Sequence, residues 1–140
     1  MKAFGARLGA LCNGGEVVEL VGDVGAGKTT LTKGMAIGLS IDESIQSPSF
    51  TISRVYQARD DLTLYHYDFY RLPDAGIMAD DLRETLANPR AVTVIEWSGI
   101  VEGALPEDRL TLTFISPSET SRDITLKAGG AISRRLVAGL

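Results

Sequence analysis

Hydrophobic residues recur along the chain at two kinds of spacing, one typical of helices and the other of strands. Intervals of three and four residues predict four helices, whose apolar positions are Phe4, Leu8 and Leu11, then Leu31, Met35 and Leu39, then Met78, Leu82 and Leu86, and finally Ile132, Leu136 and Leu140. Alternating or continuous apolar runs predict six strands, over residues 16–21, 50–57, 62–69, 91–97, 109–115 and 123–127.

This order of elements predicts an α/β fold in three layers, with a mixed central sheet flanked by helices. Turn-forming residues separate the second strand from the third and the fifth from the sixth, so each of these pairs is expected to form a hairpin. No internal repeat, low-complexity tract or linker interrupts the sequence, and a length of 140 residues suits one domain. We therefore expect residues 1–140 to form a single domain.

Composition narrows the classes of function. The formal net charge is −4, which argues against strong autonomous binding to nucleic acid, so any nucleic acid is expected to be held mainly by a partner. Cys12 is the one cysteine, which excludes an internal disulfide and fits a reducing compartment. No apolar run approaches the ~20 residues that a membrane span needs, and the N-terminus has no features of a secretion signal. These features predict a cytoplasmic protein with no membrane partner.

The stretch GDVGAGKTT lies between the first predicted strand and the second predicted helix. It matches the phosphate-binding loop pattern G-x-x-x-x-G-K-[ST] in full, in the context that the pattern requires, and so predicts a P-loop NTPase fold. Lys28 is expected to reach the β- and γ-phosphates of ATP, and the Thr29 hydroxyl to ligate Mg²⁺. The predicted nucleotide-binding residues are Gly22, Asp23, Val24, Gly25, Ala26, Gly27, Lys28, Thr29 and Thr30.

The motifs of other P-loop classes are missing from the sequence. It contains no N-K-x-D guanine motif, no L-S-G-G signature of transporter ATPases, and no arginine-rich lid of the kind that nucleotide kinases carry. What remains is a minimal ATPase. A small-molecule or nucleotide kinase using the same loop and a nucleotide-dependent binding module without useful hydrolysis stay open as alternatives.

Three further stretches carry candidate chemistry. Glu96 ends a short apolar strand, where an acid of a P-loop protein is expected to face the phosphates and orient Mg²⁺ or the attacking water. Trp97, which follows it, suits either a core or an interface. His66 and Asp68 share one face of the third strand, either as functional groups or as a structural His–Asp hydrogen bond. The hydroxyls of residues 47–51 are candidates for contact with Mg²⁺ or the γ-phosphate.

Taken together, these motifs resemble the TsaE (YjeE) family, the small bacterial ATPases of tRNA threonylcarbamoyladenosine biosynthesis. The resemblance rests on GDVGAGKTT, SPSFT, HYDFYRL, IEW and LPEDRL, in that order, and covers almost the whole chain. It implies an ATPase that joins the TsaD and TsaB proteins, an assembly that places a threonylcarbamoyl group on the adenosine beside the anticodon of tRNAs that read A-starting codons. TsaD then carries the transfer chemistry.

The resemblance also implies roles for single residues. Lys28 is implied as a catalytic phosphate ligand, Thr29 as a metal ligand, and Glu96 as the catalytic acid associated with Mg²⁺. Asp68 is implied as the second acid, which positions water or metal for hydrolysis. Residues 47–51 match the family's switch-like segment, in which Ser49 replaces the usual threonine. Arg71 is a further candidate for steadying charge or contacting a partner. The family usually has a Thr or Ser before the first helix that helps to enclose the base. Because this sequence begins at Met1-Lys2, we expect that contact to be missing or made by other residues.

Overall fold

The computed structural model describes residues 1–22, 27–45, 53–70, 76–115 and 123–140. The predicted helices are present as α1 (Lys2–Leu11), α2 (Lys28–Gly38), α3 (Gly76–Leu86) and α4 (Ala131–Gly139). The predicted strands are present as β1 (Val17–Val21), β2 (Ser53–Gln57), β3 (Thr63–Asp68), β4 (Ala91–Glu96), β5 (Leu110–Ile115) and β6 (Asp123–Ala128). Two short 3₁₀ helices, η1 (Arg59–Asp61) and η2 (Ser98–Ala104), were not predicted. Within the described ranges, no helix is long and apolar enough to cross a membrane.

All six strands form one mixed sheet in the order β2-β3-β4-β1-β5-β6. The four inner strands are parallel, and β2 and β6 pair antiparallel at the two edges. The two antiparallel pairs are the predicted hairpins, so the mixed sheet is confirmed. The carboxyl ends of the parallel strands lie at one edge of the sheet, which is where α/β proteins of this kind place their ligands.

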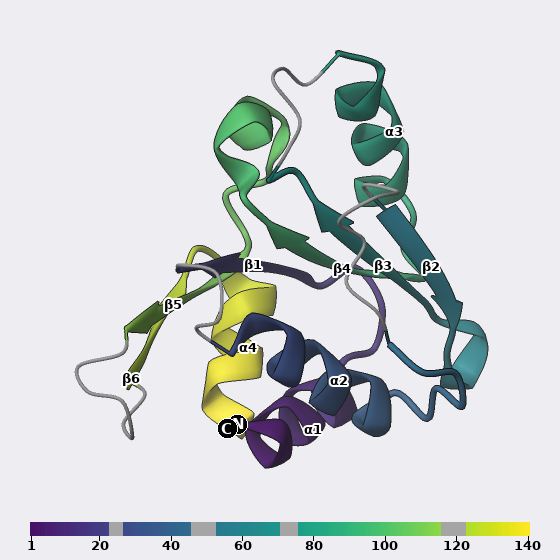
Figure 1. Cartoon of the computed structure of the whole chain (residues 1–140), viewed down its shortest axis with the longest axis vertical. Helices are drawn as coiled ribbons and strands as arrows, with labels where there is room; N and C mark the ends of the chain where they lie inside the picture. The colour runs from purple at the N-terminus through teal and green to yellow at the C-terminus, as the bar shows by residue number, and fades with distance from the viewer. Residues whose placement is uncertain (23–26, 46–52, 71–75, 116–122) are drawn as a thin grey trace.

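Helices cover both faces of the sheet, which gives the predicted three layers (Figure 1). On one face α1, α2 and α4 pack against the strands through a core that includes Leu8, Leu31, Met35, Val94 and Leu136. On the other face α3 and η2 pack through a smaller core made of Val17, Tyr67, Phe69, Leu82, Ile95 and Val101. Successive residues of a strand point to opposite faces, so β1, β3 and β4 contribute to both cores, whereas the core residues of β5 belong to the first core alone.

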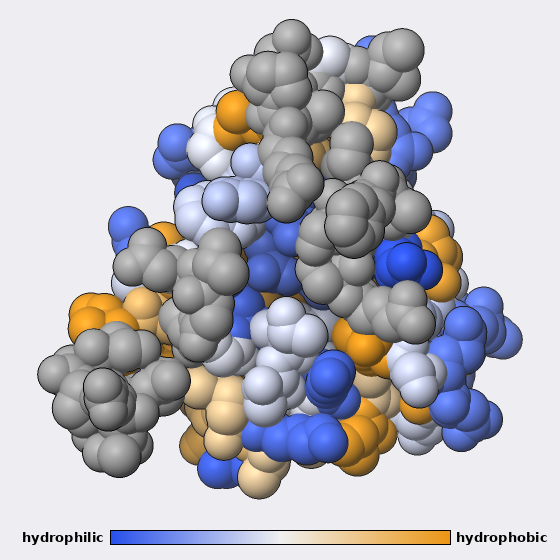
Figure 2. All heavy atoms as spheres, in the orientation of Figure 1, coloured by the Kyte–Doolittle hydropathy of each residue, from blue (hydrophilic) through white to orange (hydrophobic). Residues whose placement is uncertain are grey.

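The surface carries hydrophobic residues from several separate elements. Figure 2 shows hydrophilic residues near the centre of one face and hydrophobic ones scattered toward its margins. Among the described residues, the exposed large hydrophobic ones are Val21, Ile37, Val55, Tyr70, Ile100, Ile115, Ile132 and Val137. Single exposed hydrophobic residues of this kind are normal on soluble domains.

Helices α1 and α2 touch backbone to backbone. A Cβ atom at Gly9 would lie 2.3 Å from the carbonyl oxygen of Met35, and one at Gly34 would lie 2.2 Å from that of Lys2. Gly5 and Gly38 meet the facing backbone in the same way. Because glycine alone permits such an approach, these residues set the distance between the helices. They thereby position α2, whose first turn follows the predicted phosphate-binding loop.

Candidate functional site

The site lies at the carboxyl edge of the sheet, where β1, β3 and β4 end side by side. Asp68 pairs with Glu96 in the register of β3 and β4, and Leu20 pairs with Glu96 in that of β1 and β4. The two acids therefore lie on the same face of neighbouring strands, the face that packs against α2. The register brings Asp68 and Glu96 to the end of the sheet at which α2 begins.

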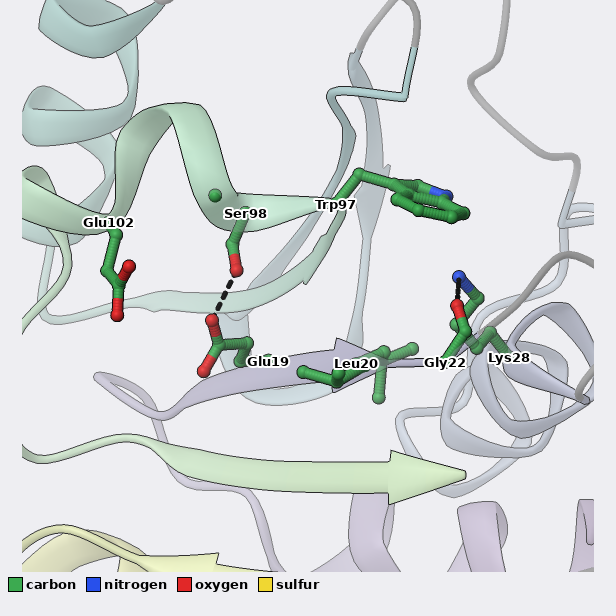
Figure 3. A pocket seen from close by; sticks show the side chains of 9 residues that line it. Glu19, Leu20, Gly22, Lys28, Trp97, Ser98 and Glu102 are labelled. Carbon is green, nitrogen blue, oxygen red and sulfur yellow. Dashed lines mark hydrogen bonds between the residues drawn. The ribbon is translucent and has the colours of Figure 1, made fainter. Parts of the chain in front are cut away.

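Lys28 is the charged group around which the site is arranged. Its side chain is buried, with the whole residue 4% exposed. The Nζ atom donates a hydrogen bond to the carbonyl oxygen of Gly22 at 2.7 Å and lies 3.9 Å from Oε1 of Glu96. The ring of Trp97 covers the same amine, with its centroid 4.3 Å from Nζ (Figure 3). A carbonyl, a carboxylate and an aromatic face thus surround the position of this charge, and all three stabilise a cation.

The first turn of α2 offers backbone amides to an anion. Gly27 precedes the helix in the left-handed conformation, with φ 101° and ψ 11°, which favours glycine. Within the described residues no side chain caps this end of the helix. The first amides of an α-helix lack partners inside the helix, and the helix dipole adds partial positive charge there. Thr29 is half-buried and Thr30 is exposed. This end of α2 has the chemistry of a phosphate site.

His66 is bonded to Glu96. The imidazole is fully buried, and its Nε2 lies 2.6 Å from Oε2 of the glutamate. The predicted alternative of a His66–Asp68 hydrogen bond is therefore wrong. Alternate residues of one strand stand about 6.5 Å apart, whereas neighbouring strands are separated by about 4.8 Å. The next strand consequently supplies the closer partner.

Asp68 stands beside these groups with a different set of contacts. Its Oδ1 accepts a hydrogen bond from the backbone amide of Tyr70 at 3.0 Å. Burial raises the pKa of the Asp68 carboxyl, the Tyr70 amide acts in the opposite direction, and the neighbouring Glu96 raises the pKa further. The net direction is upward. A carboxyl group held in this way takes up a proton more readily than one in water, which suits a group that receives a proton from water.

Trp97 has a backbone conformation that is unusual for a large residue. Its φ of 56° and ψ of 51° place it in the left-handed region, and η2 begins immediately after it. The indole ring lies against the ring of Tyr70, with centroids 4.8 Å apart, and over the amine of Lys28. Left-handed backbone at a non-glycine residue costs on the order of 1 kcal/mol and persists only where the surroundings hold it. The sequence is compatible with either a core or an interface position for Trp97, and the structure places its ring over the amine of Lys28.

A hydrogen-bond network under η2 holds the segment that follows Trp97. The Ser98 hydroxyl donates to Oε2 of Glu19, a buried carboxylate in the middle of β1 (Figure 3). Oε1 of Glu19 accepts from Nε of Arg109 at 3.0 Å and from the hydroxyl of Thr111 at 2.9 Å. Burial alone would raise the pKa of Glu19, but the hydrogen bonds from Ser98, Arg109 and Thr111 outweigh it and lower the pKa. Glu19 therefore serves as an ionised anchor between β1, β5 and η2.

A cavity of about 420 Å³ opens beside Lys28. It extends from the lysine past Trp97 toward η2 (Figure 3), and its lining residues are Glu19, Leu20, Val21, Gly22, Lys28, Trp97, Ser98, Gly99 and Glu102. Glu19, Ser98, Gly99 and Glu102 were not predicted as site residues. Of these four residues, only Glu19 could have been suspected from the sequence, because it is an acid inside the apolar run of β1. A buried carboxylate needs hydrogen-bond or ion-pair partners.

The predicted site residues divide into two groups. Gly22, Gly27, Lys28, Asp68 and Glu96 lie at one edge of the sheet, with Thr29 and Thr30 in the adjoining turn of α2. The remaining predicted positions fall outside the described residues: Asp23, Val24, Gly25 and Ala26 of the loop, the 47–51 segment with Ser49, and Arg71.

Comparisons with known proteins identify the family. A family model described as "Threonylcarbamoyl adenosine biosynthesis protein TsaE" matches residues 1–124. The tRNA threonylcarbamoyladenosine biosynthesis protein TsaE of Bacillus subtilis is 38% identical over 130 residues, which cover 92% of this chain and 80% of that protein. The TsaE protein of Treponema pallidum is 41% identical over 123 residues, covering 88% and 90%. A crystal structure of YdiB from Bacillus subtilis aligns with a TM-score of 0.78 at 34% identity, covering 98% of this chain and 84% of that one.

Proposed function

This chain belongs to the TsaE family of threonylcarbamoyl adenosine biosynthesis proteins, and we propose that it is the ATPase of that pathway. It binds ATP with Mg²⁺ and hydrolyses the γ-phosphate bond in support of the TsaD–TsaB complex. That complex forms N6-threonylcarbamoyladenosine in tRNAs that read A-starting codons. The observation that carries the proposal is the Nζ atom of Lys28, buried at the start of α2 and 3.9 Å from Oε1 of Glu96.

Lys28 and the first turn of α2 bind the phosphates. The β- and γ-phosphate oxygens accept hydrogen bonds from the amides after Gly27 and from the Lys28 amine, which exchanges its bond to the Gly22 carbonyl for a bond to phosphate. The Trp97 ring beside the amine excludes water from that contact and strengthens it. The positive end of α2 and the lysine together supply the charge that a triphosphate requires.

The donor set at the edge of the sheet fits Mg²⁺. Within the described part of the chain, no group of three or more acidic, histidine or cysteine side chains forms a metal cage. Magnesium in phosphate-transfer sites is held by one or two protein oxygens together with phosphate oxygens and water, which is what Thr29 and Glu96 provide. When bound, the ion would neutralise charge on the β- and γ-phosphates.

Asp68 orients the attacking water. A water hydrogen-bonded to this carboxylate is aimed at the γ-phosphorus, where its oxygen forms the new P–O bond while the bond to the β–γ bridging oxygen breaks. ADP leaves with that bond's electron pair, and the proton of the water passes to Asp68 and then to solvent. The raised pKa of Asp68 supports this assignment. ATP hydrolysis and tRNA modification take place in the cytoplasm, and the partner proteins bind the tRNA.

The experiment measures phosphate release from ATP by the chain alone and with TsaD, TsaB and tRNA. We expect slow release by the isolated chain and a large increase with the partners. Lys28→Ala should abolish nucleotide binding, whereas Lys33→Ala, a change to an exposed lysine on the same helix, should leave it intact. Transfer of labelled γ-phosphate to an acceptor other than water would assign the chain to the kinases instead. A hydrolysis rate that neither TsaD nor TsaB changes would contradict the proposed role of this chain in their complex.

A further inference from the structure

His66 is the one histidine of the chain, and it is buried beneath the candidate site. It lies on β3 with its Nε2 2.6 Å from Oε2 of Glu96. The carboxylate has a second oxygen, Oε1, which lies 3.9 Å from the amine of Lys28. One oxygen of Glu96 is thus held from below by the imidazole, and the other is turned toward the phosphate-binding lysine.

The other imidazole nitrogen identifies the tautomer. Nδ1 of His66 is buried and, among the residues that the structure describes, has no hydrogen-bond partner. A buried N–H without a partner costs more than a buried lone pair, because the N–H is a strong obligatory donor. A carboxylate only accepts hydrogen bonds. The proton therefore lies on Nε2, and His66 donates to Glu96.

We propose that His66 is a positioning residue for Glu96, a role that rests on the proposed function of Glu96 in holding Mg²⁺. The donated hydrogen bond keeps the carboxylate in one rotamer, with Oε1 facing the amine of Lys28 and available to Mg²⁺. Partners that orient a metal ligand in this way change metal affinity or activity by roughly 10–100-fold when removed. His66 does not touch ATP or the metal and acts through Glu96.

Two substitutions separate the donor from the bulk of the ring. His66→Gln keeps an N–H donor near the position of Nε2, whereas His66→Leu fills the space without a donor. Tyr67→Phe is the matched control, because Tyr67 is buried on the opposite face of the same strand and bonds Asp81 at 3.0 Å and Thr85 at 2.7 Å. We expect this control to lower the melting temperature and leave the Mg²⁺ dependence unchanged.

Three readouts are compared in the full chain. The first is the Mg²⁺ concentration that half-saturates phosphate release in the presence of TsaD, TsaB and tRNA. The second is the Mg²⁺ dependence of ADP binding, followed through the fluorescence of Trp97, the one tryptophan. The third is the nitrogen-15 NMR spectrum of the imidazole, which distinguishes the tautomers without any ligand. With one histidine in the chain, its signals need no further assignment.

We expect an Nε2–H tautomer in the wild type, and its signals should move in Glu96→Gln. His66→Leu should lower the rate and raise the half-saturating Mg²⁺ concentration by roughly 10–100-fold, while His66→Gln keeps most of both. The proposal would be overturned by an Nδ1–H tautomer in the wild type. It would also be overturned if His66→Gln and His66→Leu lowered the rate equally, or if His66→Leu left the half-saturating Mg²⁺ concentration unchanged. Wild-type ADP binding that is independent of Mg²⁺ would overturn it too. If the wild type does not hydrolyse ATP with its partners, the proposed function fails, and the binding and NMR measurements still decide the role of His66.

Discussion

Gly9→Ala tests whether glycine sets the distance between α1 and α2. The new Cβ would lie 2.3 Å from the carbonyl oxygen of Met35 and 2.9 Å from its Cα, both backbone atoms that cannot move aside alone. The helices must separate by roughly 1 Å, and overpacking of this kind costs about 1–3 kcal/mol. The better helix propensity of alanine returns at most about 1 kcal/mol. Because both contacts are with backbone atoms, the overpacking cost lies at the upper end of that range, and the net loss of unfolding free energy is about 2 kcal/mol.

The assay is thermal and urea denaturation followed by circular dichroism. A loss of about 2 kcal/mol lowers the melting temperature of a chain of this size by roughly 6–8 °C. Gly103→Ala is the matched control, because a Cβ there meets nothing within 4 Å, and its melting temperature should stay the same or rise. A Gly9→Ala melting temperature equal to or above that of the wild type would refute the argument that glycine sets the separation of the helices.

Three further predictions concern the network around the site and its supports. Glu19→Gln should lower the unfolding free energy by about 2 kcal/mol at neutral pH, because the charged hydrogen bonds from Arg109 and Ser98 are weakened. Because the fold lowers the pKa of Glu19, its contribution is complete above the ordinary value of 4.5 and is lost as the pH falls through the lowered folded pKa, so urea titrations of wild type and variant should converge in acid. Asp108→Ala should lower the free energy of unfolding by about 1 kcal/mol, because Asp108 accepts hydrogen bonds from the amides of Ile132 and Ser133 at the start of α4. Thermal melting measures this loss, and an unchanged melting temperature would show that these bonds do not stabilise the fold. Trp97→Phe should still bind nucleotide, with an affinity reduced by a few-fold in calorimetry, because about 1 kcal/mol of cation–π attraction to Lys28 is lost. An unchanged affinity would show that the indole ring does not contribute to binding through Lys28.

Much of the fold follows from local patterns. The apolar spacing over α1, α2, α3 and α4 identifies the faces that pack against the sheet, because each helix must bury one stripe. The hairpins and the mixed sheet follow from turn residues between apolar runs. The short helix η2 was missed because its seven residues, two of them glycine, have no helical periodicity.

The sequence predicted the main residues of the candidate site, but not the hydrogen bonds between them. Lys28, Asp68 and Glu96 each stand at the end of a predicted strand or the start of a predicted helix, so their gathering at one edge follows from the topology. The pairing of His66 with Glu96 depends on the register between β3 and β4, which no local pattern encodes. The partners of Glu19 lie 79 to 92 residues away in the chain, and only the folded sheet brings them together.

The most direct test of the proposed ATPase is tRNA modification by the chain with TsaD, TsaB, ATP and Mg²⁺, comparing wild type with Asp68→Asn over several turnovers. If hydrolysis drives the assembly, the wild type should produce many modified tRNAs per complex. The variant, which still binds ATP through Lys28, should stop at or below about one per complex, since the water-orienting carboxylate is gone. Multiple turnovers by Asp68→Asn at the wild-type rate would contradict the assignment of hydrolysis to this site.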